Sequence, residues 1–330
     1  MKIAVVGAGA IGAYLGACLA RGGTETYLLA RGPHLEAMRS EGVKVIEDTE
    51  TWSARLPCTD DPRDIGPVDT VILGLKAYSY ASAGELLRPL MVADTAVVAA
   101  QNGIPWWYFH RHGGPYDGRR IESVDAKGAV SATIPPERAI GCVVFPAAVL
   151  VAPGVVHHIE GRRFAIGEPG GEISERCRRL SEAMTAGGLK CPIDERLREQ
   201  IWVKLMGNAA FNPLSALTGA TMAEICRFPP TRELAAQMMQ ETIDVASSLG
   251  CRVPVSIERR LAGAERVGDH RTSMLQDLQA GKRLELEVLL GAVLELAELT
   301  GVEVRRLRAI HAAVTLLANT RSHALQEPLS

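Results

Sequence analysis

The feature that most constrains the fold is a glycine motif between a short apolar run and a helix-forming segment near the start of the chain. Lys2–Val6 has the continuous apolar character of a strand that is buried on both faces. Gly7-Ala8-Gly9-Ala10-Ile11-Gly12 follows and matches the pattern GxGxxG, and Ala10–Arg21 has the composition of a helix that Gly22-Gly23 end. A strand, a glycine turn and a helix in this order predict the first crossover of an α/β domain that binds a dinucleotide.

Each glycine of the motif has its own physical role in such a turn. Gly7 allows the tight turn after the strand, Gly9 lets the backbone approach a pyrophosphate, and Gly12 lets the helix pack closely on the strand. The N-terminus of the helix adds N–H groups and a partial positive charge for the phosphates. The predicted cofactor-binding loop therefore consists of Gly7, Ala8, Gly9, Ala10, Ile11 and Gly12. The alternative is a glycine-rich turn that binds no nucleotide.

The residue at the end of the second expected strand indicates which nicotinamide cofactor would bind. An acidic residue there would hold the ribose 2′-hydroxyl of NAD and would repel a 2′-phosphate. This chain has Arg31, 24 residues after Gly7 (31 − 7), and Glu25 lies at the opposite end of that strand. Because a guanidinium forms paired, charge-assisted hydrogen bonds with phosphate, we predict NADPH or NADP as the cofactor, with a surface arginine as the alternative.

The character of the chain changes near residue 195. Before it, apolar runs alternate with helix-compatible segments, which predicts a parallel sheet with right-handed crossovers. After it, strand signals nearly vanish and helical periodicity continues to the end. We therefore expect an α/β fold, with a Rossmann-type NADP-binding domain over 1–194 and an all-helical substrate and catalytic domain over 195–330. The segment 104–138 is the least regular part of the first domain.

The positions of these runs define the expected elements. Strands are expected at 2–6, 25–30, 43–46, 51–56, 68–75, 95–100, 141–150 and 155–159. Helices are expected at 10–21, 33–42, 77–90 and 173–186, and then at 195–217, 231–250, 256–265, 284–301 and 304–320. Pro229-Pro230 and Gly250–Pro254 are expected to separate the later helices.

Composition excludes several classes of protein. The chain has 330 residues, of which 47% are hydrophobic and 22% are charged, and its formal net charge of −2 without a Lys/Arg run predicts no nucleic-acid partner. Seven scattered cysteines without a CxxC pair predict free thiols in the cytoplasm, and the eight histidines form no metal-binding motif. The apolar stretch 2–20 contains four glycines, so we interpret it as strand, turn and helix rather than as a signal peptide. No other segment is long and apolar enough to predict a membrane span.

Two groups of polar residues fall where a ligand would bind. Lys76 and Asn102 follow the two strands expected at 68–75 and 95–100, and in an open α/β sheet the ligand crevice lies at these carboxyl ends. Lys204, Asn208 and Asn212 are spaced four apart, so they share one face of a helix whose other residues are mostly apolar. A buried lysine and two buried amides need partners, which favours a functional pocket over a solvent-facing polar stripe.

Together these residues resemble the ketopantoate reductase (2-dehydropantoate 2-reductase) family over nearly the whole chain. The resemblance rests on the GxGxxG motif, Lys76, Asn102-Gly103, the helix with Lys204, Asn208 and Asn212-Pro213, and the pattern Ser273-Met274-Leu275-Gln276-Asp277 followed by Glu285. By themselves Ser273 and Glu285 would predict only a helix start and an exposed acid.

The resemblance implies a Rossmann domain, a helical C-terminal domain, and an active site in the cleft between them. It implies that Lys204 is the general acid, with Glu285 as a second catalytic residue that holds Lys204 or a substrate hydroxyl. It assigns substrate binding to four residues, Asn102, Asn208, Asn212 and Ser273, and it brings Lys76, Asn102 and Glu285 near the nicotinamide. Ala147 aligns with a further cofactor contact. The expected reaction is NADPH-dependent reduction of a 2-oxo acid to a 2-hydroxy acid, with ketopantoate as first candidate, no metal, no membrane partner, and dimerisation left open.

Several departures from the family pattern keep other functions open. Met222 stands where the biosynthetic enzymes often carry an asparagine, His270 replaces an asparagine near Ser273, and the segment 104–138 is long. These differences favour, as an alternative, a paralogue that reduces a bulkier 2-oxo acid or ketone. A 3-hydroxyacid dehydrogenase-like enzyme and a non-catalytic NADPH sensor are the remaining hypotheses.

Overall fold

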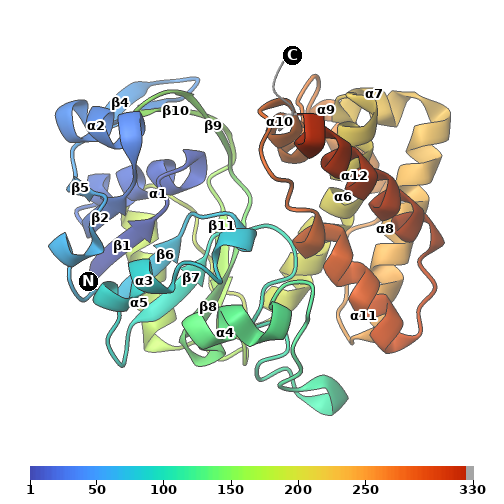
Figure 1. Cartoon of the computed structure of the whole chain (residues 1–330), viewed down its shortest axis with the longest axis horizontal. Helices are drawn as coiled ribbons and strands as arrows, with labels where there is room; N and C mark the ends of the chain where they lie inside the picture. Colours follow the sequence, from blue (N-terminus) through green and yellow to red (C-terminus); the bar gives the residue numbers. More distant parts are fainter. Residues whose placement is uncertain (325–330) are drawn as a thin grey trace. The chain divides into compact units, whose positions relative to one another are not determined.

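In the computed structural model, which describes residues 1–324, the chain divides into two units (Figure 1). The first unit consists of Met1–Arg120 and Asp125–Leu197. The second consists of Ile121–Val124 and the chain from Arg198 onward. Sheets are confined to the first unit, and the second is built from helices, as the sequence predicts. The chain therefore passes between the units three times.

A seven-stranded sheet forms the centre of the first unit. Its strands are β1 (Lys2–Val6), β2 (Glu25–Leu29), β5 (Cys58–Thr59), β6 (Thr70–Leu73), β7 (Ala96–Ala99), β8 (Ala139–Val144) and β11 (Phe164–Gly167). The order is β11-β8-β7-β6-β1-β2-β5, and every pair is parallel except β8 with β11. The predicted parallel sheet is confirmed, and β5 and β11 are edge strands that the sequence analysis missed.

A second, four-stranded sheet was not predicted. It contains β3 (Val43–Ile46), β4 (Thr51–Ala54), β9 (Ala147–Ala152) and β10 (Val155–Glu160) in the order β4-β3-β10-β9. The single strand expected at 141–150 is wrong, because the chain breaks at Phe145-Pro146 and passes from one sheet to the other. Proline lacks the N–H that a central strand needs.

Helices of the first unit connect these strands. They are α1 (Ala10–Arg21), α2 (Gly32–Glu41), α3 (Gly84–Leu87), α4 (Ala129–Thr133) and α5 (Glu175–Ala186). The helix expected at 77–90 is wrong, since only α3 and two short 3₁₀ turns form there. Serine side chains compete for backbone groups in this segment, as when the Ser82 hydroxyl donates to the Ser79 carbonyl at 3.0 Å.

The second unit is helical in its described residues. Its helices are α6 (Leu197–Thr218), α7 (Met222–Arg227), α8 (Pro229–Ser248), α9 (Ile257–Arg266), α10 (Ser273–Gln279), α11 (Ala292–Thr300) and α12 (Arg305–Ala324). α7 was missed, although Thr221 and Glu224 form a capping box at its start. Pro229-Pro230 forms the first turn of α8, where the missing N–H groups need no partner. The helix expected at 284–301 is shorter, because a π-helical turn, Glu287–Gly291, precedes α11.

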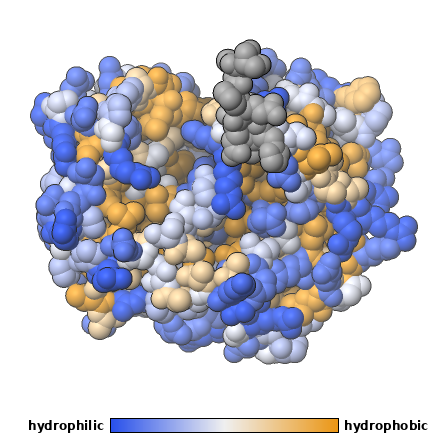
Figure 2. Space-filling view, viewed as in Figure 1, coloured by the Kyte–Doolittle hydropathy of each residue, from blue (hydrophilic) through white to orange (hydrophobic). Residues whose placement is uncertain are grey.

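Apolar side chains lie both within the helices and on the surface of the molecule. Among the described residues, no helix combines the length and the apolar character needed to cross a membrane. Figure 2 shows hydrophobic residues in patches among hydrophilic ones on the face that it displays. The large apolar side chains that remain exposed are Tyr78, Val92, Leu150, Val151, Ile173, Phe228, Val267 and Leu316.

The irregular segment 104–138 supplies four residues to the helical unit. One carboxylate oxygen of Glu295, on α11, accepts the Glu122 N–H at 2.8 Å, and the other accepts the Ser123 N–H at 2.8 Å. Asp125, two residues after Ser123, is fully buried in the first unit, where its carboxylate accepts the Val130 N–H at 2.7 Å. The Glu295 carboxylate therefore anchors the short segment Ile121–Val124 to the helical unit, and the Asp125 carboxylate anchors the chain that follows to the first unit.

Replacing Glu295 by alanine is expected to speed amide hydrogen exchange at Glu122 and Ser123 by about tenfold or more, since each N–H loses a charge-assisted bond. Hydrogen–deuterium exchange measured by mass spectrometry would check this. Glu298→Ala is the matched control, because Glu298 lies on the same helix and pairs with Arg308 instead. Unchanged exchange in the Glu295 variant would show that Ile121–Val124 is held by other contacts.

Candidate active site

The central strands of the seven-stranded sheet end in register. Val6 of β1 pairs with Leu29 of β2 and with Leu73 of β6, and Leu73 pairs with Ala99 of β7. The segments that follow these residues therefore emerge at one edge of the sheet. The chain runs from β1 to β2 on one side and later returns to β6 on the other, so the strand order reverses between β1 and β6. Ligands of open α/β sheets bind at such a reversal.

Three glycines make this edge unusually compact. Gly7 has φ +96°, a backbone conformation that other residues rarely adopt. A Cβ atom at Gly12 would overlap the carbonyl oxygen of Gly7, and so would a Cβ atom at Gly74. Gly12 brings α1 close to the loop, as predicted, whereas Gly74 was missed. Its position directly after the apolar strand β6 was the available signal.

Gly9 fits the role of a phosphate-binding position. It is exposed, and a Cβ atom there would meet nothing closer than the Gly74 carbonyl oxygen at 3.9 Å. The space around Gly9 is therefore open to a ligand, in contrast to Gly7 and Gly12. Gly9 is also the N-cap of α1, so first-turn N–H groups face this space. The loop can hold the pyrophosphate of a dinucleotide.

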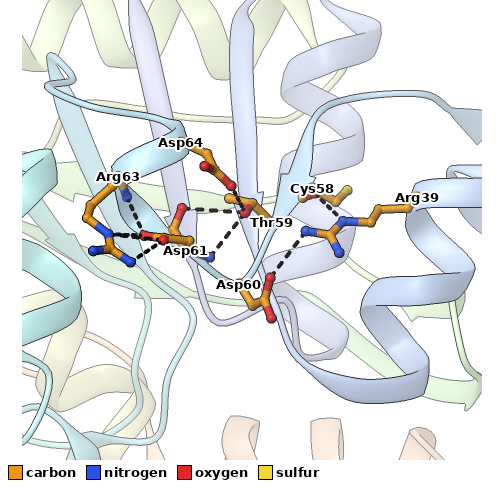
Figure 3. Close-up of polar contacts among 7 residues, drawn as sticks. All are labelled: Arg39, Cys58, Thr59, Asp60, Asp61, Arg63 and Asp64. Carbon is orange, nitrogen blue, oxygen red and sulfur yellow. Dashed lines mark hydrogen bonds and ion pairs between the residues drawn. The ribbon is translucent and has the colours of Figure 1, made fainter.

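Arg31 lies where the sequence analysis expected it, between β2 and α2. Its side chain is exposed and has no acidic partner among the described residues. Two other arginines near β5 are each paired: Arg39 with Asp60 at 3.2 Å, and Arg63 with Asp61 at 2.6 Å (Figure 3). Their charges are balanced locally, whereas the Arg31 side chain is available to a phosphate.

The turn after β5 is held by its own hydrogen bonds, as Figure 3 shows. The Thr59 hydroxyl donates to the Asp64 carboxylate at 2.6 Å and accepts the Asp61 N–H at 3.1 Å. Hydrogen bonds from the Arg63 side chain and backbone N–H lower the pKa of Asp61 to about 2. Asp61 is therefore ionised at neutral pH and directed at Arg63.

Lys76 and Asn102 also follow strands at this edge. Leu73 of β6 pairs with Ala99 of β7. Lys76 comes three residues after Leu73, and Asn102 comes three residues after Ala99. Both side chains are partly buried. The Asn102 Oδ1 atom is buried without a hydrogen-bond partner among the described residues, which is costly unless a ligand supplies a donor. Ala147 is the first residue of β9, in the four-stranded sheet.

The polar face of α6 contains Lys204, Asn208 and Asn212, which the sequence predicts as catalytic and substrate-binding residues. Lys204 and Asn208 are partly buried, and Asn212 is only 5% exposed. Their neighbours on the helix are buried apolar residues: Ile201, Trp202, Leu205, Met206, Ala209, Ala210, Phe211 and Leu214. The predicted buried helix is confirmed. The Asn212 Nδ2 atom is buried and has no acceptor within residues 1–324, so it can donate to a ligand.

Arg260 is a further polar residue at this helix that the sequence analysis missed. A Cβ atom at Gly207 would overlap the Arg260 guanidinium, so the side chain from α9 lies directly against α6. Gly207 comes three residues after Lys204, which brings Arg260 to the margin of the polar face. A glycine inside an otherwise apolar helix was the signal for this close approach.

Ser273 and Glu285 lie in and after α10. Ser273 is exposed as the first residue of α10, whose cap is the Thr272 hydroxyl accepting the Leu275 N–H at 3.3 Å. Glu285 is partly buried between α10 and the π-helical turn. The predicted cofactor residues thus belong to the first unit, and all the others except Asn102 belong to the second.

A cavity of about 900 Å³ lies beside α12 in the helical unit. Its charged lining residues are Lys282, Arg283, Glu287 and Arg321, and none of the predicted site residues lines it. No group of three or more His, Cys, Asp or Glu in the described part of the chain could hold a metal ion.

Comparison with known proteins identifies the family. A model described as "Ketopantoate reductase PanE/ApbA" matches residues 3–171, and one described as "Ketopantoate reductase PanE/ApbA C terminal" matches residues 196–318. The chain belongs to the ketopantoate reductase family. The resemblance proposed from the sequence motifs is confirmed, and with it the order of a Rossmann-type domain and a helical domain.

Relatives in the ketopantoate reductase family match along nearly the entire chain. A 2-dehydropantoate 2-reductase from Mesorhizobium japonicum is 47% identical over 97% of this chain and 99% of its own. A solved structure from Ralstonia solanacearum MolK2 is 37% identical and superposes with a TM-score of 0.90 over 97% of this chain and 98% of its own. The structure of 2-dehydropantoate 2-reductase from Geobacter metallireducens is 27% identical, with a TM-score of 0.84 over 96% of this chain and all of its own. The protein is thus a member of a family of oxidoreductases.

Proposed function

We propose that this protein reduces a 2-oxo acid to the 2-hydroxy acid with NADPH, and that 2-dehydropantoate (ketopantoate) is its substrate. The observation that carries the proposal is the 47% identity, over nearly the full length of both chains, with a 2-dehydropantoate 2-reductase. The glycine loop and the polar face of α6 support it, because they provide separate surfaces for a dinucleotide and for a small polar substrate.

The substrate side of the proposal depends on α6. The Lys204 ammonium polarises the ketone oxygen and then donates the proton that this oxygen needs as it becomes a hydroxyl. Bound NADPH supplies the hydride for the carbonyl carbon. The Asn212 Nδ2, which has no acceptor in the described part of the chain, orients the oxygens of the substrate together with the amide of Asn208 and the hydroxyl of Ser273. Glu285 holds Lys204 or a substrate hydroxyl in position.

The cofactor side of the proposal depends on the edge of the seven-stranded sheet. The loop Gly7–Gly12 holds the pyrophosphate at the N-terminus of α1. Arg31 binds the 2′-phosphate, and Lys76 and Asn102 lie toward the nicotinamide. The buried Asn102 Oδ1 would accept a hydrogen bond from the ligand, which would remove the cost of leaving it unpaired. Ala147 remains a proposed cofactor contact.

The assay that tests the proposal follows NADPH consumption by the purified protein with ketopantoate, beside bulkier 2-oxo acids. Strong turnover of ketopantoate would support the proposed substrate. Turnover of only the bulkier acids would favour a paralogue, which the partly exposed Met222 at the start of α7 makes the second candidate. Oxidation of 3-hydroxy acids with NAD would instead identify a 3-hydroxyacid dehydrogenase-like enzyme, and NADPH binding without turnover of any substrate would favour a sensor.

We also propose that the protein works in the cytoplasm, as a monomer or homodimer, without a nucleic-acid or membrane partner.

Replacing Arg31 by alanine is expected to raise the Kd for NADPH by about 10–100-fold while changing the Kd for NADH little, because only NADPH carries the 2′-phosphate. Fluorescence titration with each nucleotide would measure both constants. Arg39→Ala is the matched control, since Arg39 lies in α2, the helix that follows Arg31, but is held by Asp60 and the Cys58 carbonyl. Equal weakening of NADPH and NADH binding by Arg31→Ala would contradict the assignment.

A further inference from the structure

His34 makes two hydrogen bonds that join three segments of the first unit. The side chain lies in the first turn of α2, and its Nε2 atom is 2.6 Å from the Ala8 carbonyl oxygen. Its Nδ1 atom accepts the Gly154 N–H at 2.8 Å. A carbonyl can only accept and a backbone N–H can only donate, so the hydrogen of the imidazole is on Nε2. The contacts therefore define a neutral ring with one donor and one acceptor in use.

The bond to Ala8 determines how the next peptide group is directed. In a planar trans peptide the carbonyl of one residue and the N–H of the following residue point in opposite directions. Since the Ala8 carbonyl points at His34, the Gly9 N–H points away from it. Gly9 is exposed, and within residues 1–324 its N–H has no acceptor. The peptide thus presents a free donor at the open side of the glycine loop, beside the N-terminus of α1.

The bond to Gly154 keeps the ring in this orientation. Gly154 lies in the turn between β9 and β10, and its own carbonyl accepts the Lys44 N–H of β3 at 2.9 Å. A Cβ atom at Gly154 would be 3.1 Å from the Cβ of Ala37, so the turn packs against α2. His34 is therefore braced by the four-stranded sheet while it holds a loop of the seven-stranded sheet.

We propose that His34 is a positioning residue for the cofactor: it holds the Ala8–Gly9 peptide with the Gly9 N–H directed at the pyrophosphate. If this peptide rotated, the Ala8 carbonyl oxygen would face the phosphates and would repel them. The glycines make the loop compact but leave this peptide free to rotate, and His34 removes that freedom before the ligand binds. The inference rests on the proposed binding of NADPH at the Gly7–Gly12 loop.

Two substitutions separate the two hydrogen bonds. The amide nitrogen of glutamine can take the place of the imidazole Nε2, so His34→Gln keeps a donor for the Ala8 carbonyl. The amide oxygen of asparagine can take the place of Nδ1, so His34→Asn keeps the acceptor for Gly154 and loses the bond to Ala8. Kd values for NADPH are measured by fluorescence titration, and melting temperatures are measured without nucleotide.

The His34→Asn variant is expected to bind NADPH about tenfold more weakly than the unchanged protein, and His34→Gln within about threefold of it. Adenosine 2′-monophosphate, which has no pyrophosphate, is expected to compete equally well in all three proteins. Equal NADPH affinity in the Asn variant would overturn the inference, and so would a loss of affinity that merely follows the loss of melting temperature in both variants. If the unchanged protein failed to bind NADPH, the proposed function would fall together with the inference.

Discussion

Replacement of Lys204 by methionine is expected to lower kcat for ketopantoate reduction by about 10²–10⁴-fold, the contribution typical of a general acid. Methionine keeps the length and apolar body of the side chain, so α6 can still pack among its buried neighbours, while the ketone oxygen loses both its polarising charge and its proton donor. Steady-state kinetics with saturating NADPH would measure the loss.

The Lys204 variant is expected to keep its affinity for NADPH, because the proposed cofactor contacts come from the first unit. Lys44→Met, which removes an exposed lysine from β3, is the matched control and should leave kcat unchanged. If the Lys204 variant retained kcat within a fewfold of the unchanged protein, another group would have to supply the proton, and the assignment of α6 as the catalytic helix would be wrong.

Replacement of Gly12 by alanine is expected to destabilise the first unit by about 3 kcal/mol, because the new methyl group would overlap the Gly7 carbonyl and force α1 away from the loop. The corresponding fall in Tm is about 6–12 °C. NADPH binding is expected to be lost as well, since the displaced helix no longer presents its N-terminus to the pyrophosphate.

Two other glycines make the Gly12 experiment specific. Gly263→Ala in α9 meets no atom within 4 Å, so it is expected to raise stability by about 0.5–1 kcal/mol through helix propensity alone. Gly9→Ala meets only ordinary van der Waals contact, so it should leave Tm nearly unchanged while its methyl group obstructs the pyrophosphate. A Gly12 variant with the Tm and NADPH affinity of the unchanged protein would refute the close packing described here.

The proposed cofactor-binding loop and the proposed catalytic helix lie in different units, so variants in each unit are expected to change different measured constants. The first unit holds the glycine loop and Arg31, so variants there should act on nucleotide affinity. The helical unit holds Lys204, Asn208 and Asn212, so variants there should act on kcat or on KM for the oxo acid. The chain also connects the two units on either side of Ile121–Val124, in addition to Leu197-Arg198, and Glu295 anchors that short segment within the helical unit.

Much of this protein follows from local sequence patterns. The strand β1, the GxGxxG turn and the helix α1 have the predicted bounds, because buried strands and helix N-termini impose strict requirements on a short stretch of chain. The four-residue spacing of Lys204, Asn208 and Asn212 likewise placed three polar groups on one face of a buried helix. These features depend on neighbours within one or two turns, so the sequence alone determined them.

Tertiary structure decided what depends on distant segments meeting. Gly74 acquires its importance only because the register of β1 with β6 brings it against Gly7, and Arg260 only because α9 packs on α6 at Gly207. His34 falls within the helix expected at 33–42, and only the fold brings it between the Ala8 carbonyl and the Gly154 N–H. Hydrogen bonds and steric overlap act over a few ångströms in space, and no spacing along the chain records which segments will come that close.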